Sequence, residues 1–178
     1  MTTPELQERF QAVVDQHKKI LYKVCNLYCR NRDYRDDLAQ EIIIQLWRSF
    51  GKFDERYRFS TWMYRIALNV AISFYRRENR RTRYVVSDEQ HLLEAIDETK
   101  NQPEEIRLLY EFIEGLDPLN KALVLLYLDG NNYQEIAEVL GISETNVATK
   151  ISRLKSKMKQ EFRGTGQTES QAKSRTET

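Results

Sequence analysis

The chain has 178 residues, of which 40% are hydrophobic and 31% charged, and its formal net charge is only +1. This is enough apolar material for one large or two small domains, and no apolar run approaches the roughly 18 residues that a membrane span needs. The start, MTTPELQERF, lacks the basic segment and apolar core of a signal peptide, so we expect a cytoplasmic protein without membrane insertion.

Residues 1–83 predict a first helical module. Thr3-Pro4 signals the start of a long amphipathic helix that we expect to run to about Cys29. A second helix is expected from an N-cap at Asp33 to Gly51, with an apolar residue at every fourth position. A third helix is expected to start at Ser60 or Thr61 and to run into a cluster of arginines. One side of that helix carries Trp62, Ile66, Val70 and Phe74.

Cys25 and Cys29 lie one helical turn apart and could join His17 as metal ligands. No second pair of ligands lies nearby, and we expect two reduced thiols, no metal and no cofactor.

Asp37, Gln40 and Glu41 form a polar stripe on the second helix. Paired carboxylates can serve acid–base catalysis, but the chain offers them no histidine partner, no metal set and no glycine-rich phosphate loop. We therefore interpret the stripe as a docking surface for a protein partner and expect no enzyme activity. A merely solvated face is the alternative.

Aromatic and basic residues alternate along the third helix and the loop before it. Aromatic faces accept unstacked bases, and arginines hold phosphates, so this composition favours a surface for single-stranded or melted DNA. One alternative is that the aromatic and apolar residues belong to the hydrophobic core, which we favour for Trp62 and Ile66. The other is that the arginines merely form a solvent-exposed helix end. The residues concerned are Phe53, Arg56, Tyr57, Arg58, Phe59, Trp62, Tyr64, Arg65, Phe74, Tyr75, Arg76 and Arg77.

Residues 84–102 are acidic and weakly periodic, which predicts a linker to a second module at residues 103–163. Helices are expected at 104–115 and 118–129. Basic residues cluster on both sides of the acidic segment, so two modules are expected to make two nucleic-acid contacts. After Gly164 the polar tail, residues 164–178, is expected to be disordered.

The segment YQEIAEVLGISETNVATKISR, residues 133–153, predicts a helix-turn-helix. Gly141 provides the turn, Ser143 can cap the second helix, and Val147, Ile151 and Leu154 form its buried face. The remaining face is available to a DNA groove, as in other helix-turn-helix proteins, although an ordinary helical hairpin with a solvated face is the alternative. The residues of that face are Thr145, Asn146, Thr149, Lys150 and Arg153.

These segments together resemble a known family. The strings DLAQE, FSTWMYRIALN and YRR are similar to regions two-two to two-four of the extracytoplasmic-function (ECF) sigma factors of bacterial RNA polymerase. The strings LDPLNKALVLLYLDG and YQEIAEVLGISETNVATKISRLK are similar to region four. The resemblance covers roughly residues 5–83 and 103–162 in the family's order. It implies an all-α fold of two small helical domains joined by an acidic linker, the second a helix-turn-helix.

The resemblance also implies a role for each surface. Asp37, Gln40 and Glu41 match the helix that docks on the largest polymerase subunit, and the helix from Ser143 matches the reader of the −35 promoter element. The −10 element would be recognised and melted by a set that includes Asn69, Trp62, Phe59, Arg65, Arg76, Arg77 and Arg80. The implied partners are core RNA polymerase and promoter DNA. Many members are restrained by an anti-sigma factor, which makes such a protein a candidate third partner.

Three residues depart from the family pattern. Ser73 stands where Asp is frequent, and Ala148 and Lys150 stand where Lys and Arg are common, which leaves the −35 sequence open. Two other functions remain as alternatives. A stand-alone helix-turn-helix regulator would leave the first module without a role, and a helical enzyme acting on nucleic acid lacks a visible catalytic set.

Overall fold

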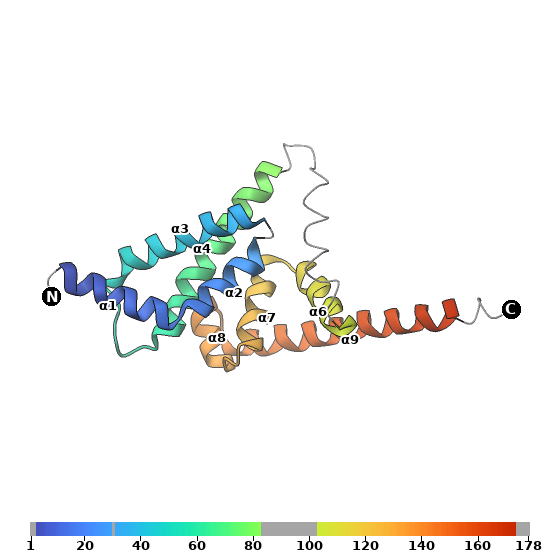
Figure 1. The fold of residues 1–178 in the computed structure, drawn as a ribbon. Coiled ribbons are helices and arrows are strands. Elements are labelled where there is room, and N and C mark those ends of the chain that lie inside the picture. The colour runs from blue at the N-terminus through green and yellow to red at the C-terminus, as the bar shows by residue number, and fades with distance from the viewer. Residues whose placement is uncertain (1–2, 30, 83–102, 174–178) are drawn as a thin grey trace. The chain divides into compact units, whose positions relative to one another are not determined.

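The computed structural model of the protein describes residues 3–29, 31–82 and 103–173, and every regular element in these ranges is a helix (Figure 1). The all-α prediction is therefore confirmed. The helices belong to two compact units, the first containing α1 to α4 and the second most of α6 to α9. Among the described residues, no helix combines the length and apolar character needed to span a membrane. The predicted linker at residues 84–102 lies outside the described residues.

The first unit consists of α1 (Thr3–Gln16), α2 (Lys18–Tyr28), α3 (Arg32–Phe50) and α4 (Phe59–Thr82). The prediction of one long helix to Cys29 was wrong, because the chain leaves helical geometry at His17, with φ −112° and ψ 13°. Consecutive polar residues from Gln16 to Lys19 give this point little apolar packing to keep the helix straight. The break separates α1, which packs through Phe10, from α2, which packs through Val24.

The starts of two helices differ from the predictions by one or two residues. Asp33 lies inside α3 and is not its N-cap, and α4 starts at Phe59 and not at Ser60 or Thr61. Differences of this size at helix ends are common, because end residues make few backbone hydrogen bonds.

The core of the first unit is formed where α2, α3 and α4 pack together (Figure 1). Its fully buried side chains recur at three- and four-residue intervals on each helix, and burying each large one contributes about 1.5–3 kcal/mol. The predicted apolar side of α4 was displaced for three of its four residues, because only Phe74 of that side is buried. Trp62, Ile66 and Val70 are half-buried, because α4 directs a broader neighbouring face to both α2 and α3. That face is made of Met63, Tyr64, Ala67, Leu68, Ala71 and Phe74.

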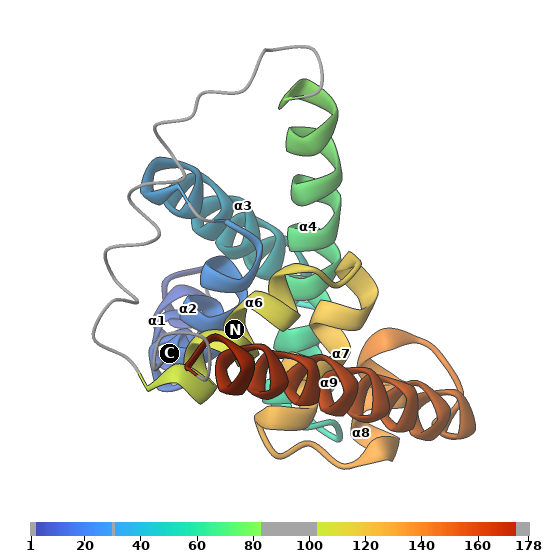
Figure 2. The ribbon, with the colours of Figure 1, turned by 90° about the vertical axis from the view of Figure 1, so that its right-hand side faces the viewer.

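The second unit consists of α6 (Glu104–Glu114), α7 (Pro118–Leu128), α8 (Tyr133–Leu140) and α9 (Glu144–Lys173). The Asp117 carboxylate caps α7 by accepting bonds from the Leu119 and Asn120 amides, both at 3.1 Å, and Pro118 occupies the first turn. Leu123, Leu126 and Val147 are fully buried between the helices of the unit. Figure 2 shows α9 extending across the view, with α7 and α8 beside it.

Helix α9 does not end at Gly164 as predicted but continues to Lys173. One glycine inside a helix costs about 1 kcal/mol relative to alanine, and no proline follows to stop the helix. Glu169, Gln171, Ala172 and Lys173 all favour helix, so extension past Gly164 is physically reasonable. The predicted helix end at Gly164 was therefore wrong, the disorder of the tail stays a prediction, and residues 174–178 lie outside the described residues.

Candidate nucleic-acid interface

The helix-turn-helix of the second unit is fixed by caps at each of its ends. Asn132 and Glu135 form a reciprocal capping box at the start of α8, with both bonds at 2.9 Å. Gly141 follows α8 in the left-handed conformation, at φ 67°, where a side chain would be strained. The Ser143 hydroxyl then accepts a hydrogen bond from the backbone amide of Asn146 at 3.2 Å, as predicted.

The predicted DNA-reading residues share one side of α9. Helical rotation places Thr145, Asn146, Thr149, Lys150 and Arg153 opposite the buried Val147, Ile151 and Leu154. Four of the five are exposed and Lys150 is half-buried. The Thr149 hydroxyl donates to the Thr145 carbonyl at 2.9 Å, so its oxygen can act toward DNA as an acceptor only. The face therefore combines one amide, two hydroxyls and two cations.

Lys155 lies two residues after Arg153 but contacts another helix of the unit. Its ammonium group donates to the Tyr127 hydroxyl at 2.6 Å and lies 4.4 Å from the centre of that ring. The hydrogen bond to Tyr127 raises the pKa of Lys155. This lysine therefore connects α9 to α7, a contact that the sequence analysis did not predict.

In the first unit, the predicted −10 residues lie along one outer side of α4. Helical rotation places Trp62, Arg65, Asn69 and Arg76 on the same side, with Ser73 between the last two. Arg65, Asn69 and Arg76 are exposed. The Asn69 carbonyl accepts a bond from the Ser73 hydroxyl at 2.9 Å, and its amide side chain has no hydrogen-bond partner within the described residues. Arg80 belongs to α4, and its side chain lies outside what the structure describes.

A cluster of four aromatic rings, Phe50, Phe53, Phe59 and Trp62, stands at the start of this side of α4. The Phe53 ring centre is 5.4 Å from that of Phe59 and 5.0 Å from that of Trp62. Phe50 is buried and anchors the cluster, whereas the other three rings are half-buried and reach the surface. We call these four residues the aromatic cluster.

Two of the aromatic residues predicted for the DNA surface are in the core. Tyr64 is 2% exposed and Phe74 is 4% exposed, so neither ring can stack on a base. Burial also raises the pKa of Tyr64 to about 12. Tyr64 belongs to the neighbouring face that α4 buries, whereas Phe74 was also expected on the apolar side of this helix.

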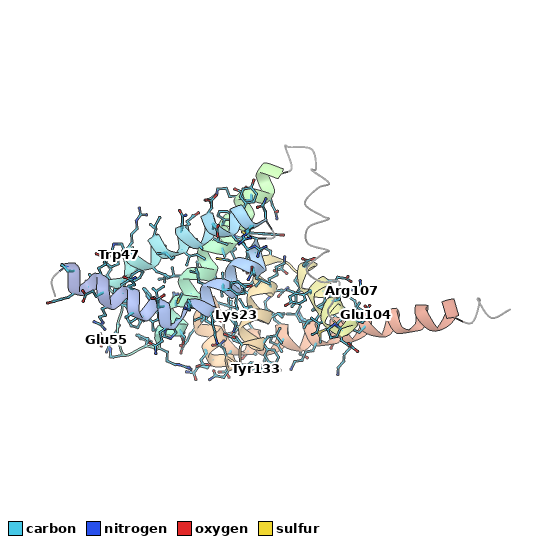
Figure 3. All side chains as sticks on the ribbon, in the orientation of Figure 1. Lys23, Trp47, Glu55, Glu104, Arg107 and Tyr133 are labelled. Carbon is cyan, nitrogen blue, oxygen red and sulfur yellow. The ribbon has the colours of Figure 1, made fainter. Side chains whose placement is uncertain are left out.

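The polar stripe on α3 is accessible as predicted. Asp37 and Gln40 are exposed, and Glu41 is half-buried. Ile44, one turn further along the same side, is 49% exposed. Trp47, labelled in Figure 3, is 37% exposed on a neighbouring side of the helix. Sequence reasoning missed these apolar residues, although three consecutive isoleucines at 42–44 cannot all face one core.

An ion pair connects this stripe to α4. The Arg77 guanidinium lies 2.9 Å from the Glu41 carboxylate, and Glu41 raises the pKa of Arg77. Arg77 also lies 4.9 Å from the centre of the Phe74 ring. The structure thus brings together two residues that were predicted to face different partners.

The two cysteines are free and buried. Burial raises the pKa of Cys25 to about 12 and that of Cys29 to about 11, which makes both thiols poor nucleophiles and metal ligands. The described part of the chain contains no group of three His, Cys, Asp or Glu residues placed to hold a metal ion.

Comparison with known proteins yields matches in both units. A sequence model of Sigma-70 region 2 matches residues 13–81, and one of Sigma-70, region 4 matches residues 106–158. The ECF RNA polymerase sigma-E factor of Escherichia coli K12 is 30% identical over 159 residues, covering 83% of each chain. The factor SigW of Bacillus subtilis is 28% identical over 171 residues, covering 88% of this chain and 90% of the relative.

A solved structure has the same fold. It is the sigma factor RpoE in complex with the anti-sigma factor NepR from Bartonella quintana, at a TM-score of 0.64 and 14% identity, covering 86% of this chain and 96% of that chain.

Proposed function

The chain belongs to the ECF sigma factors of bacterial RNA polymerase, and from that premise we propose how its surfaces divide the work of promoter-specific initiation. The outer side of α4 with the aromatic cluster holds the melted −10 strand. The exposed face of α9 reads the −35 duplex, and the α3 stripe docks on core polymerase. The protein itself is not an enzyme, because the polymerase supplies the chemistry of RNA synthesis.

One observation carries the −10 assignment. An exposed amide, Asn69, lies on the same side of α4 as Arg65 and Arg76, and half-buried aromatic rings stand at one end of that side. Rings can stack on unpaired bases, cations can hold phosphates, and an amide can match the donor and acceptor pattern of one base edge. Because the Asn69 side chain is exposed and makes no hydrogen bond to the described residues, a bracing role inside the fold is disfavoured.

The −35 assignment has support of the same kind. The face of α9 that begins at Thr145 presents polar side chains close to the helix N-terminus, where a helix-turn-helix meets base edges in the major groove. Lys150 can contact guanine, but it lacks the two-pronged geometry of arginine, so weaker discrimination is expected at its position.

Transcription from randomised promoters, by core polymerase reconstituted with the full chain, tests both assignments at once. Asn69→Ala is expected to alter base preference at one −10 position, and Asn146→Ala at one −35 position, each by the equivalent of about 1–3 kcal/mol. Each variant is the control for the other, because each should leave the other element's preference unchanged. An unaltered preference with either variant would remove that residue from its proposed role.

The docking assignment is tested by charge reversal. Asp37→Lys combined with Glu41→Lys is expected to abolish capture of core polymerase, since both carboxylates reach the surface. Glu144→Lys with Glu161→Lys, two exposed carboxylates on α9, is the matched control. Capture at wild-type strength by the α3 variant, with helicity preserved in both variants, would show that polymerase docks elsewhere.

An anti-sigma factor is a reasonable further partner. The structure of the sigma factor RpoE that shares this fold is a complex with such a protein. We propose that the exposed apolar side chains Ile44 and Trp47 beside the α3 stripe contribute to protein contacts of this unit. The same face is assigned to core polymerase, so the two partners would compete.

A further inference from the structure

The loop between α3 and α4, residues 51–58, is built as a short series of turns. The Lys52 amide donates to the Ser49 carbonyl at 3.0 Å, and the Tyr57 amide donates to the Asp54 carbonyl at 3.1 Å. The Asp54 carboxylate also accepts from the backbone and guanidinium of Arg56, which lowers the pKa of Asp54. Phe53 joins this loop to the aromatic cluster, so a movement of the loop changes the space beside Trp62.

Helix α1 holds the tip of this loop from outside. Arg9 forms an ion pair with Glu55, which Figure 3 shows on the loop beside α1. The Arg9 guanidinium also lies 5.9 Å from the centre of the Phe50 ring, the buried anchor of the aromatic cluster. Its neighbour Phe10 is buried and packs edge-on against Trp47 at 5.1 Å and Phe50 at 5.2 Å. Phe10 thus anchors α1 on the end of α3, and Arg9 extends from it to the loop.

Arg9 and Phe10 lie ahead of the segment that is similar to Sigma-70 region 2, which begins at residue 13, whereas their partners Trp47, Phe50 and Glu55 lie within it. The family match therefore does not account for the α1 side of these contacts.

We propose that Arg9 is a positioning residue for −10 selection, which acts through Glu55 to hold the loop at residues 51–58 against the aromatic cluster. The inference rests on the proposed −10 role of α4. Arg9 contacts no DNA in this account. It fixes the width of the space between the loop and α4, and a base that fits that width is preferred over one that requires the loop to move.

The energetic scale of this effect is modest. An ion pair between exposed side chains contributes little to the stability of a fold, because water and salt screen it. If the loop can open, however, a small change in the free-energy difference between its open and closed states is enough to change the fraction of time that it is closed. We therefore expect base discrimination to change by about two- to fivefold when the pair is broken, while the unfolding temperature hardly changes.

The test uses the full chain with core polymerase and a library randomised at the −10 element. Arg9→Glu and Glu55→Arg should each broaden the selection at one −10 position and leave the −35 preference unchanged. The exchanged variant, with both substitutions, should restore the wild-type selection, because it rebuilds the pair with reversed charges. Lys19→Glu, a charge reversal of the same size at an exposed position on α2, is the control and should have no effect.

Two results would overturn the proposal: wild-type selection by both single variants, or failure of the exchanged variant to restore it. Asn69→Ala in the same library separates this inference from the function on which it rests. If Asn69→Ala alters selection and the single reversals do not, only the role of Arg9 fails. If the reversals broaden selection and Asn69→Ala does not alter it, the loop is the reader, so the assignment of Asn69 fails and the role of Arg9 is supported.

Discussion

The two proposed DNA surfaces of this protein are built in opposite ways. The face of α9 is one regular helix whose polar side chains need only be presented to a groove, and local caps such as Ser143 set its start. The surface on α4 is assembled from a helix, a loop and aromatic rings that belong to α3 and α4, with Arg9 of α1 holding the loop. A rigid duplex can be read by a single helix, whereas an unpaired strand needs a surface that encloses its bases.

This difference has a consequence for mutations. Substitutions that weaken −35 reading should concentrate on α9 and on the helices that support it directly. Substitutions that weaken −10 selection should be spread over residues far apart in sequence, because the α4 surface combines residues of α4, the loop before it, the aromatic cluster and α1. The two surfaces should therefore respond independently to mutation, and the residues that support each of them should differ.

The largest loss of stability is expected from a mutation that opens a cavity in the second unit. Leu126 is fully buried in α7, so Leu126→Ala should destabilise that unit by about 2–5 kcal/mol. Both tryptophans of the chain, Trp47 and Trp62, belong to the first unit, so tryptophan fluorescence reports on that unit alone. Thermal melts should show a lower transition in circular dichroism and an unchanged transition in fluorescence. A fluorescence transition that moves equally would mean that the two units unfold as one.

The helix-turn-helix was predictable almost to the residue, and the α4 surface was not. The Asn132 and Ser143 side chains accept from backbone amides three residues away, and the Gly141 amide donates to the Ala137 carbonyl four residues away, so their effect can be inferred from adjacent sequence. The core face of α4 could not, because Trp62 and Met63 are both apolar, and only packing against α2 and α3 decides which one is buried.

Long-range side-chain contacts had no sequence signal at all. Arg77 and Glu41 are 36 positions apart, and Arg9 and Glu55 are 46 apart. Charge patterning within a helix predicts partners three or four residues away, but it cannot pair residues from different helices. The site residues were therefore predicted individually, while the contacts among them had to come from the structure.

The second-largest loss of stability is expected at alkaline pH, and it should be concentrated in the first unit. Burial raises the pKa of Cys25 to about 12, of Cys29 to about 11 and of Tyr64 to about 12, and all three belong to that unit. Thiols of the unfolded chain ionise near pH 9.0, and above that pH the folded state holds more protons than the unfolded state. Stability is therefore complete below about pH 9 and falls as pH rises, by up to about 1.4 kcal/mol per pH unit for each thiol.

Fluorescence melts between about pH 8 and about pH 10.5 measure this effect, and Cys25→Ala with Cys29→Ala provides the comparison. The variant should be less stable at every pH, because it loses packing, yet its unfolding temperature should decline less steeply with pH. Equal slopes in the variant and the wild type would show that the thiols ionise alike in the folded and unfolded states.

The smallest change in stability is expected from breaking the ion pair that joins the polar stripe on α3 to α4. Arg77 and Glu41 are each about half exposed, with side-chain exposures of 50% and 44%, so their coupling should be about 0.2–1 kcal/mol in a double-mutant cycle of Arg77→Ala and Glu41→Ala. Raising the salt concentration to about 1 M should remove most of it, because the screening length then falls to about 3 Å. Arg77→Ala should still cost some stability at high salt, since the guanidinium also lies over the Phe74 ring. A coupling well above 1 kcal/mol that persists in salt would mean that the pair is shielded from water. The docking stripe and the −10 surface would then form one rigid body, and the α4 surface would depend on polymerase contacts as well as on its own loop.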